Sequence, residues 1–190
     1  MELALPEEFV LLDTEYTSWE GAWERGWSGP NEYKEIIQVG MIRIGKDKKE
    51  EASLKLYVKP VKNPILSDYI KNLTHISQEE VDAGITLEEC NLKIKEFLGD
   101  FPAFAYGTDE AIIRENCELI GTLFPFLNGR IADIREIIFP SLEKLKIDPK
   151  IYTSGTLISA FSNQPLHAHD AVNDMRNLLE AIKEIEKRLL

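Results

Sequence analysis

Residues 9–15, FVLLDTE, combine a short apolar run with two acids that follow it directly. The length and the branched side chains of the run Phe9 to Leu12 indicate a buried strand. Side chains alternate between the two faces of a strand, so Asp13 and Glu15 are expected to project together where the strand leaves the sheet. Two carboxylates this close repel each other unless a proton or a cation intervenes, and Mg²⁺ is bound by such oxygen pairs. A polar turn after a strand also explains Asp-x-Glu, and for this pair alone it is the favoured explanation.

The rest of the chain supplies further strands and helices around this first strand. Strands are expected over residues 35–44, 54–58, 101–106 and 131–134, and helices over 66–73, 77–81, 86–98, 109–119, 135–145, 153–161 and 171–189. Residues 16–34 lack periodicity and are expected to form a long loop. Three strands in succession, followed by alternating helices and strands, predict an α/β fold: a mixed five-stranded sheet flanked by helices, in a single domain over residues 1–190.

Composition and charge restrict the classes of function. The 190 residues include 22 Lys and Arg against 33 Asp and Glu, which gives a net charge of −11 and a pI near 4.8 and argues against a broad basic surface for nucleic acid. The two cysteines, Cys90 and Cys117, form no close pair, so a disulfide scaffold or a cysteine zinc site is not expected. The acidic N-terminus is unlike a signal peptide, and no apolar run reaches the roughly 20 residues that span a bilayer. We therefore expect a cytoplasmic protein with no membrane partner.

A second candidate group lies just before the last expected helix, in the segment from His169 to Asp174. A histidine can accept a proton from water at neutral pH, and a carboxylate beside it can hold the cation that acidifies that water. Asp170 is a good N-cap, so ordinary helix-start chemistry explains Asp170 without requiring His169. His167 and His169 form a His-x-His pair, but a zinc site needs about two more ligands, and no neighbouring Cys or His supplies them.

Asp109 is a third candidate, because it follows an expected strand and opens an expected helix. A role as the N-cap of the helix and a role in a functional site explain this acid about equally well. All three candidate groups lie at strand ends or helix starts, and α/β folds bind ligands at the carboxyl ends of strands. Four acids and one histidine gathered there would make an oxygen-rich centre for two cations, which can clamp the attacking and leaving oxygens in phosphodiester hydrolysis.

The pattern resembles the DEDDh group of DnaQ-like 3′–5′ exonucleases, which have an RNase H-like fold. The matching segments are residues 9–15, residues 106–109 (YGTD) and residues 169–174 (HDAVND). Residues 56–60, 63–67 and 73–81 are similar to the subgroup that degrades small-RNA duplex ends and histone-mRNA tails. The likeness covers nearly the whole chain. It departs from the family in a long Trp-rich insertion after Glu15 and in the absence of an additional basic nucleic-acid-binding domain.

The resemblance implies a role for each candidate side chain. Asp13 would bridge two Mg²⁺ or Mn²⁺ ions, and Asp109 would support the second ion. Glu15 and Asp174 would complete the shell of the ion that holds the attacking water, and His169 would accept the proton from that nucleophile. The implied activity is a metal-dependent 3′–5′ exonuclease that releases nucleoside 5′-monophosphates from RNA or single-stranded DNA, with RNA favoured. The negative charge of the chain suggests a substrate that is short or is delivered by a protein partner.

Two other functions fit the same residues. One is a DNA proofreading or repair exonuclease of the same fold, and the other is a catalytically silent interaction module, against which the presence of all five side chains counts.

The insertion after Glu15 holds all three tryptophans, Trp19, Trp23 and Trp27, at a spacing of four. They could form a wall on which terminal bases stack, at about 1–3 kcal/mol per base. They could instead pack one side of a short helical insertion onto the domain, which is the explanation we favour.

Overall fold

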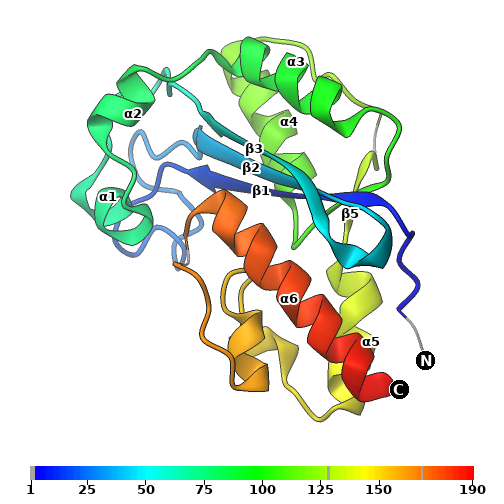
Figure 1. The fold of residues 1–190 in the computed structure, drawn as a ribbon. Coiled ribbons are helices and arrows are strands. Elements are labelled where there is room, and N and C mark those ends of the chain that lie inside the picture. Colours follow the sequence, from blue (N-terminus) through cyan, green and yellow to red (C-terminus); the bar gives the residue numbers. More distant parts are fainter. Residues whose placement is uncertain (1–2, 128, 168) are drawn as a thin grey trace.

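Strand β1 (Phe9–Tyr16) lies in the middle of a five-stranded sheet with the order β3-β2-β1-β4-β5 (Figure 1). The computed structural model describes residues 3–127, 129–167 and 169–190. Strands β2 (Ile36–Ile44) and β3 (Glu50–Tyr57) continue the sheet from β1 as an antiparallel meander, while β4 (Ala103–Ala105) and β5 (Ile131–Asp133) run parallel to β1 on its other side. This arrangement confirms the predicted mixed five-stranded sheet.

The apolar run of β1 is continuous because helices cover both faces of the sheet. Phe9 and Leu11 pack into one core with helices α5 (Arg135–Lys144) and α6 (Ala171–Leu189). Val10 and Leu12 point to the opposite core, which contains residues of α3 (Leu87–Leu98) and α4 (Asp109–Ile120). All four side chains are fully buried. Figure 1 shows these two pairs of helices on opposite sides of the sheet.

Smaller elements complete the fold beyond the two helical layers. Helices α1 (Asp68–Thr74) and α2 (Gln78–Asp82) lie at one end of the sheet (Figure 1), and α2 begins with a capping box between Ser77 and Glu80. Short 3₁₀ turns occupy Lys46–Lys48, Pro149–Ile151 and Leu157–Phe161. The helix expected over residues 153–161 is therefore shorter than predicted. None of the helices in the described parts of the chain is long and apolar enough to cross a membrane.

The polar end of β1 is longer than the sequence pattern suggested. Hydrogen bonding to β2 continues past the apolar run as far as Tyr16, with Asp13 opposite Gly40 and Glu15 opposite Gln38. The strand therefore places both acids inside the sheet rather than in a turn after it. The register of the pairing shifts only between Glu15 and Tyr16. The sheet backbone thus fixes the positions of the two carboxylates.

Gly40 allows the start of α6 to approach the sheet beside Asp13. A Cβ atom at Gly40 would lie 2.3 Å from the carbonyl carbon of Ala171, a distance that no side chain can occupy. The backbone N–H of Ala171 also donates to Oε1 of Gln38 at 2.8 Å. This contact brings the first turn of α6 close to the acids of β1, although the two elements stand at opposite ends of the sequence.

Candidate active site

Four acidic side chains from three elements share one site. Asp13 and Glu15 come from β1, Asp109 is the first residue of α4, and Asp174 lies in the first turn of α6. Burial raises the pKa of Asp13 well above its usual range, and the nearby charges of Asp109, Glu15 and Asp174 raise it further. The structure therefore brings all four predicted acids together.

Asp109 is held by the residue that separates the two acids of β1. The backbone N–H and the hydroxyl of Thr14 both donate to Oδ1 of Asp109, at 3.0 and 2.7 Å. The N-cap position of α4 belongs to Thr108, so the N-cap explanation of Asp109 is wrong. Burial raises the pKa of Asp109 to about 6 although both hydrogen bonds from Thr14 lower it. The Asp109 carboxylate thus faces β1 instead of capping its own helix.

Asp174 is buried between the entering loop of α6 and a glycine. The backbone N–H of His169 donates to Oδ1 of Asp174 at 3.1 Å, and a Cβ atom at Gly155 would lie 2.3 Å from the same oxygen. Burial raises the pKa of Asp174 to about 7. Asp170 has a different role: it caps α6 through the N–H of Asn173 and forms an ion pair with Lys55, as its helix-start interpretation predicted.

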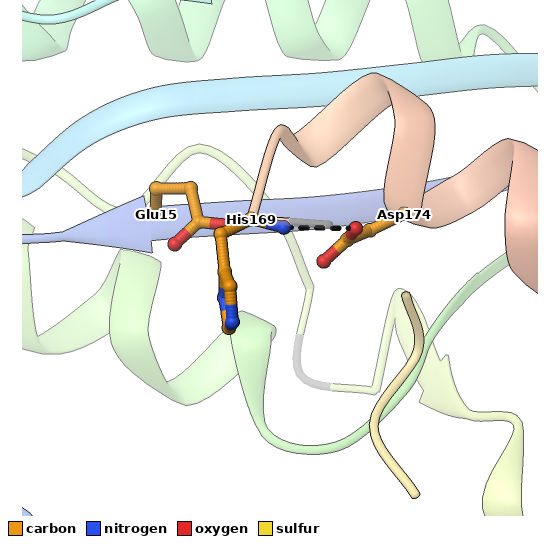
Figure 2. Close-up of side chains that lie close together, drawn as sticks. All are labelled: Glu15, His169 and Asp174. Atoms are coloured by element: carbon orange, nitrogen blue, oxygen red, sulfur yellow. Dashed lines mark hydrogen bonds between the residues drawn. The ribbon is translucent and has the colours of Figure 1, made fainter. Parts of the chain in front are cut away.

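Glu15, His169 and Asp174 offer ligand atoms that lie within 4.8 Å of one another, so these three residues could hold a metal ion. Figure 2 shows Glu15 projecting from β1 beside His169 and Asp174, which belong to the loop before α6 and to its first turn. Burial, and then the charges of Asp174 and Asp109, raise the pKa of Glu15 to about 8. Burial lowers the pKa of the half-buried His169 ring, which favours its neutral form.

The donor set fits divalent cations. Among the ion pairs of the described residues, none involves Asp13, Glu15, Asp109 or Asp174, so no Lys or Arg neutralises these carboxylates. Several buried carboxylates without a cationic partner retain protons, as their raised pKa values indicate, or bind metal. Hard cations such as Mg²⁺ prefer this oxygen-rich environment.

Two cavities meet at the acids. One, of about 670 Å³, is lined by Asp109 and extends to Tyr106, Arg135 and Lys150. The other, of about 360 Å³, is lined by Glu15, His169 and Asp174 and continues between aromatic and aliphatic side chains. Six residues line both cavities: Asp13, Thr14, Tyr16, Trp23, Thr153 and Ser154. A substrate that fills both cavities would therefore pass directly over the carboxylates.

Sequence reasoning missed several residues that shape this site. Thr14 could have been suspected, because it stands between two candidate acids and carries a hydroxyl. Gly155, Arg135 and Lys150 gave no comparable signal, since their nearness to the acids depends only on tertiary packing. Asp133 ends β5, and its carboxylate accepts hydrogen bonds from the backbone and the guanidinium of Arg135.

Comparison with known proteins gives a consistent picture. Residues 10–182 match the RNase_T exonuclease family. ERI1 exoribonuclease 2 of Xenopus laevis is 33% identical over 85 residues, which are 44% of this chain and 11% of that protein. "Probable 3'-5' exonuclease KapD" of Bacillus subtilis is 28% identical over 128 residues, which are 66% of this chain and 60% of that protein. The chain thus spans less than two thirds of either relative.

A solved structure shares the fold. The nuclease domain of 3'hExo, a DEDDh family member bound to rAMP, superposes with a TM-score of 0.76 at 18% identity, over 97% of this chain and 94% of that one. The similarity extends over the whole arrangement of sheet and helices that carries the acids, and it confirms the RNase H-like exonuclease fold.

Proposed function

The chain belongs to the RNase_T exonuclease family, and we propose that it removes nucleotides one at a time from the 3′ end of RNA or single-stranded DNA. The single observation that carries this proposal is the cluster of Asp13, Glu15, Asp109 and Asp174: the first two are half-buried and the last two buried, and none of the ion pairs of the described residues includes them. Such a cluster is costly for the folded protein unless cations offset its charge. The presence of this cluster therefore supports a reaction that depends on bound metal ions.

The four carboxylates would hold two ions, Mg²⁺ or Mn²⁺. When bound, the cations supply positive charge at the phosphodiester and acidify a water molecule held beside it. Asp13 lines both cavities and is the acid best placed to serve two ions. Thr14 fixes the orientation of Asp109, while the backbone N–H of His169 fixes that of Asp174. The protein thus contributes preorganised oxygen ligands from three elements.

His169 is the proposed general base. Its ring is half-buried, and the lowered pKa leaves the imidazole neutral and able to accept a proton at neutral pH. Its position directly before α6 places it within 4.8 Å of the ligand atoms of Glu15 and Asp174. The imidazole would take the proton of the attacking water as the water oxygen bonds to phosphorus. The bond from phosphorus to the 3′ oxygen of the preceding nucleotide would break, that oxygen would take a proton from solvent to become the new 3′-hydroxyl, and a nucleoside 5′-monophosphate would be released.

The larger cavity would receive the upstream part of the substrate strand. It offers Arg135 and Lys150, and none of the ion pairs of the described residues includes Lys150. A phosphate oxygen is the natural partner of such a cation. The net charge of −11 predicts that nucleic acid binds weakly to the protein surface outside the site. This favours substrates that are short or are delivered by a protein partner. The exoribonuclease name of the Xenopus relative supports RNA as the preferred substrate.

The proposal is tested with one oligonucleotide sequence made as RNA and as DNA, each labelled at the 3′ or the 5′ end. The protein should release labelled mononucleotide from 3′-labelled substrate at once, and EDTA should stop the release until Mn²⁺ is added in excess. Asp13→Asn should abolish it, whereas Asp170→Asn, a matched change next to the site, should retain most of it because Asn caps helices as well as Asp. A folded wild-type protein that cleaves neither substrate, or cleaves equally in EDTA, would refute the proposal and favour a silent interaction module.

A further inference from the structure

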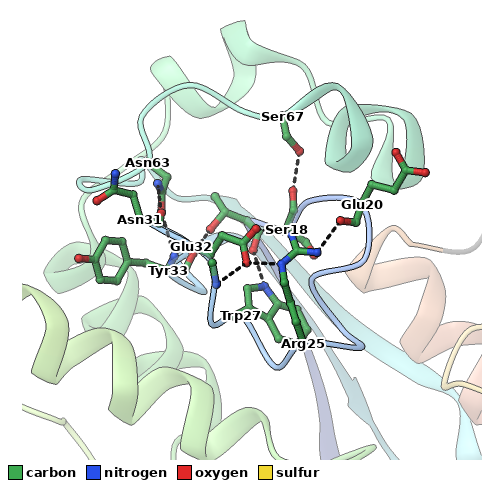
Figure 3. Close-up of polar contacts among 11 residues, drawn as sticks. Ser18, Glu20, Arg25, Trp27, Asn31, Glu32, Tyr33, Asn63 and Ser67 are labelled. Carbon is green, nitrogen blue, oxygen red and sulfur yellow. Dashed lines mark hydrogen bonds and ion pairs between the residues drawn. The ribbon is translucent and has the colours of Figure 1, made fainter.

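The insertion between β1 and β2, residues 17–35, is built from turns and is held by hydrogen bonds. The backbone N–H of Thr17 donates to the carbonyl of Glu35 at 2.8 Å and so closes the base of the insertion. Asn63 holds the part of the insertion just before Glu35: its side-chain amide donates to the carbonyl of Asn31 at 2.8 Å and accepts from the N–H of Tyr33 at 3.3 Å. Figure 3 shows the contacts of Asn63, together with a hydrogen bond from Ser67 to the carbonyl of Ser18. Hydrogen bonds therefore hold both ends of the insertion, and Arg25 joins its middle to Glu32.

The tryptophans of the insertion have different environments, so helical packing does not explain all of them. The segment forms turns instead of the short helix that a spacing of four suggested. Trp27 is half-buried: its indole N–H donates to the carbonyl of Thr17 at 3.3 Å, and Lys34 lies over its ring at 4.5 Å. Trp23 makes an edge contact with Trp27, at 5.9 Å between centroids, and the residue is 75% exposed. Packing therefore accounts for Trp27 but leaves Trp23 unexplained.

Trp23 stands where the two cavities of the site meet, since it lines both of them. The smaller cavity is lined both by apolar side chains that can contact a base, including Tyr16, Trp23 and Trp27, and by Glu15, His169 and Asp174. Its volume of about 360 Å³ lies within the range of small-ligand sites and is about half that of the larger cavity. The larger cavity also has aromatic side chains, and it adds Lys150 and Arg135, of which Arg135 is paired with Asp133. The terminal nucleotide is therefore assigned to the smaller cavity, beside the acids and His169, and the phosphates of the upstream strand to the larger one.

We infer that Trp23 is a specificity-determining residue whose indole stacks on the base of the 3′-terminal nucleotide. The inference rests on the proposed exonuclease function and names how that site selects its substrate. An exposed indole provides a flat surface for a base, and little side-chain entropy is lost when the base binds. Stacking on an indole accepts all four bases. Because the terminal base must leave its neighbours to reach the smaller cavity, single-stranded 3′ ends are preferred over paired ones.

The test combines a change in the protein with a change in the substrate. Trp23→Ala and wild type are compared on one RNA oligonucleotide that ends in a normal nucleotide or in an abasic one. On the normal RNA, the substitution should raise KM by about 5- to 150-fold, the loss of one stacked base, with little change in kcat. On the abasic RNA, the two proteins should have the same KM. Trp23→Phe should recover much of the loss, because a ring remains available.

Two controls keep the result specific. Leu123→Ala removes another exposed apolar side chain, 89% exposed and outside both cavities, and should leave KM unchanged. Binding is also followed without catalysis: a nucleoside 5′-monophosphate added in EDTA should quench the tryptophan fluorescence of wild type, and this quench should be clearly smaller in Trp23→Phe, where only Trp27 remains in the wall of the smaller cavity.

The outcomes separate this inference from the proposed function. If wild type is active and Trp23→Ala has an unchanged KM, the stacking role is overturned and the exonuclease function stands. The same holds if Trp23→Ala raises KM as much on abasic RNA as on normal RNA. A wild type that cleaves no RNA or DNA would overturn the function itself.

Discussion

Replacing Asp174 by Asn should stabilise the metal-free protein at neutral pH. Asp174 is 4% exposed, and burial raises its pKa from the usual 3.8 to about 7. A carboxyl whose pKa is higher in the folded state keeps a proton that the unfolded chain loses, so stability falls as the pH rises from about 4 to about 7. Asparagine is neutral at every pH, and its Oδ1 can still accept the hydrogen bond from the N–H of His169.

The size of the effect follows from the pKa values. The interval from 3.8 to about 7, at 1.36 kcal/mol per pH unit, corresponds to about 4 kcal/mol. The repulsion between Asp174 and Glu15 contributes to the raised pKa of Glu15 as well, so the effects of the two groups are not additive. We therefore expect the substitution to raise the free energy of unfolding by about 2–4 kcal/mol at pH 7.5, or Tm by roughly 5–15 °C for a chain of this length. At pH 5 the gain should shrink to about 1–2 kcal/mol, because the folded wild type then retains the proton.

Thermal unfolding in EDTA and in Mn²⁺, at pH 5 and pH 7.5, measures these differences. Wild type should gain stability from Mn²⁺ at pH 7.5, and Asp174→Asn should lose most of that gain because a ligand is missing. Asp170→Asn is the matched control: it changes an acid at the same helix start but should keep the response to Mn²⁺. The reasoning is refuted if Asp174→Asn in EDTA is no more stable than wild type at pH 7.5, or if its advantage is equally large at pH 5.

Three further substitutions test other parts of the site. His169→Ala should lower kcat by about 10²-fold or more without loss of Tm, and an unchanged pH–rate profile would exclude the imidazole as the base. Thr14→Val removes the hydroxyl bond to Asp109 but keeps the backbone bond, so the Mn²⁺ midpoint for activity should rise about tenfold; an unchanged midpoint would contradict the orienting role of the hydroxyl. Gly155→Ala would place a Cβ atom 2.3 Å from Oδ1 of Asp174, so the carboxylate must move and activity should fall about 10²-fold while the protein still folds; full activity would show that the contact is not needed.

Much of the fold could be predicted because local patterns report local structure. The buried run of β1 and the helical periodicity of α6 gave these elements their positions, and the predicted bounds of α6, residues 171–189, are those of the structure. The helix expected over residues 77–81 is likewise present as α2, which begins after the capping residue Ser77. Predictions were less accurate where long-range contacts determine the backbone, as in the polar half of β1, which β2 keeps in the sheet.

The insertion shows the same limit on a smaller scale. A spacing of four between tryptophans suggested a helix, but glycines at Gly21 and Gly26 adopt positive φ and the segment turns repeatedly. Which indole is half-buried and which is exposed then depends on tertiary contacts, such as those of Trp27 with Tyr16 at the end of β1 and with the carbonyl of Thr17.

The sequence alone determined which elements form and which side chains carry oxygen or imidazole ligands, because apolar period, capping residues and the spacing of two acids along one strand act over a few residues. Only the tertiary structure decided that Thr14 bonds to Asp109, 95 residues away, and that α6 begins beside β1 where Gly40 leaves room for it. It also decided the charge state of the acids, since a pKa depends on burial and on neighbouring charges that folding alone brings together.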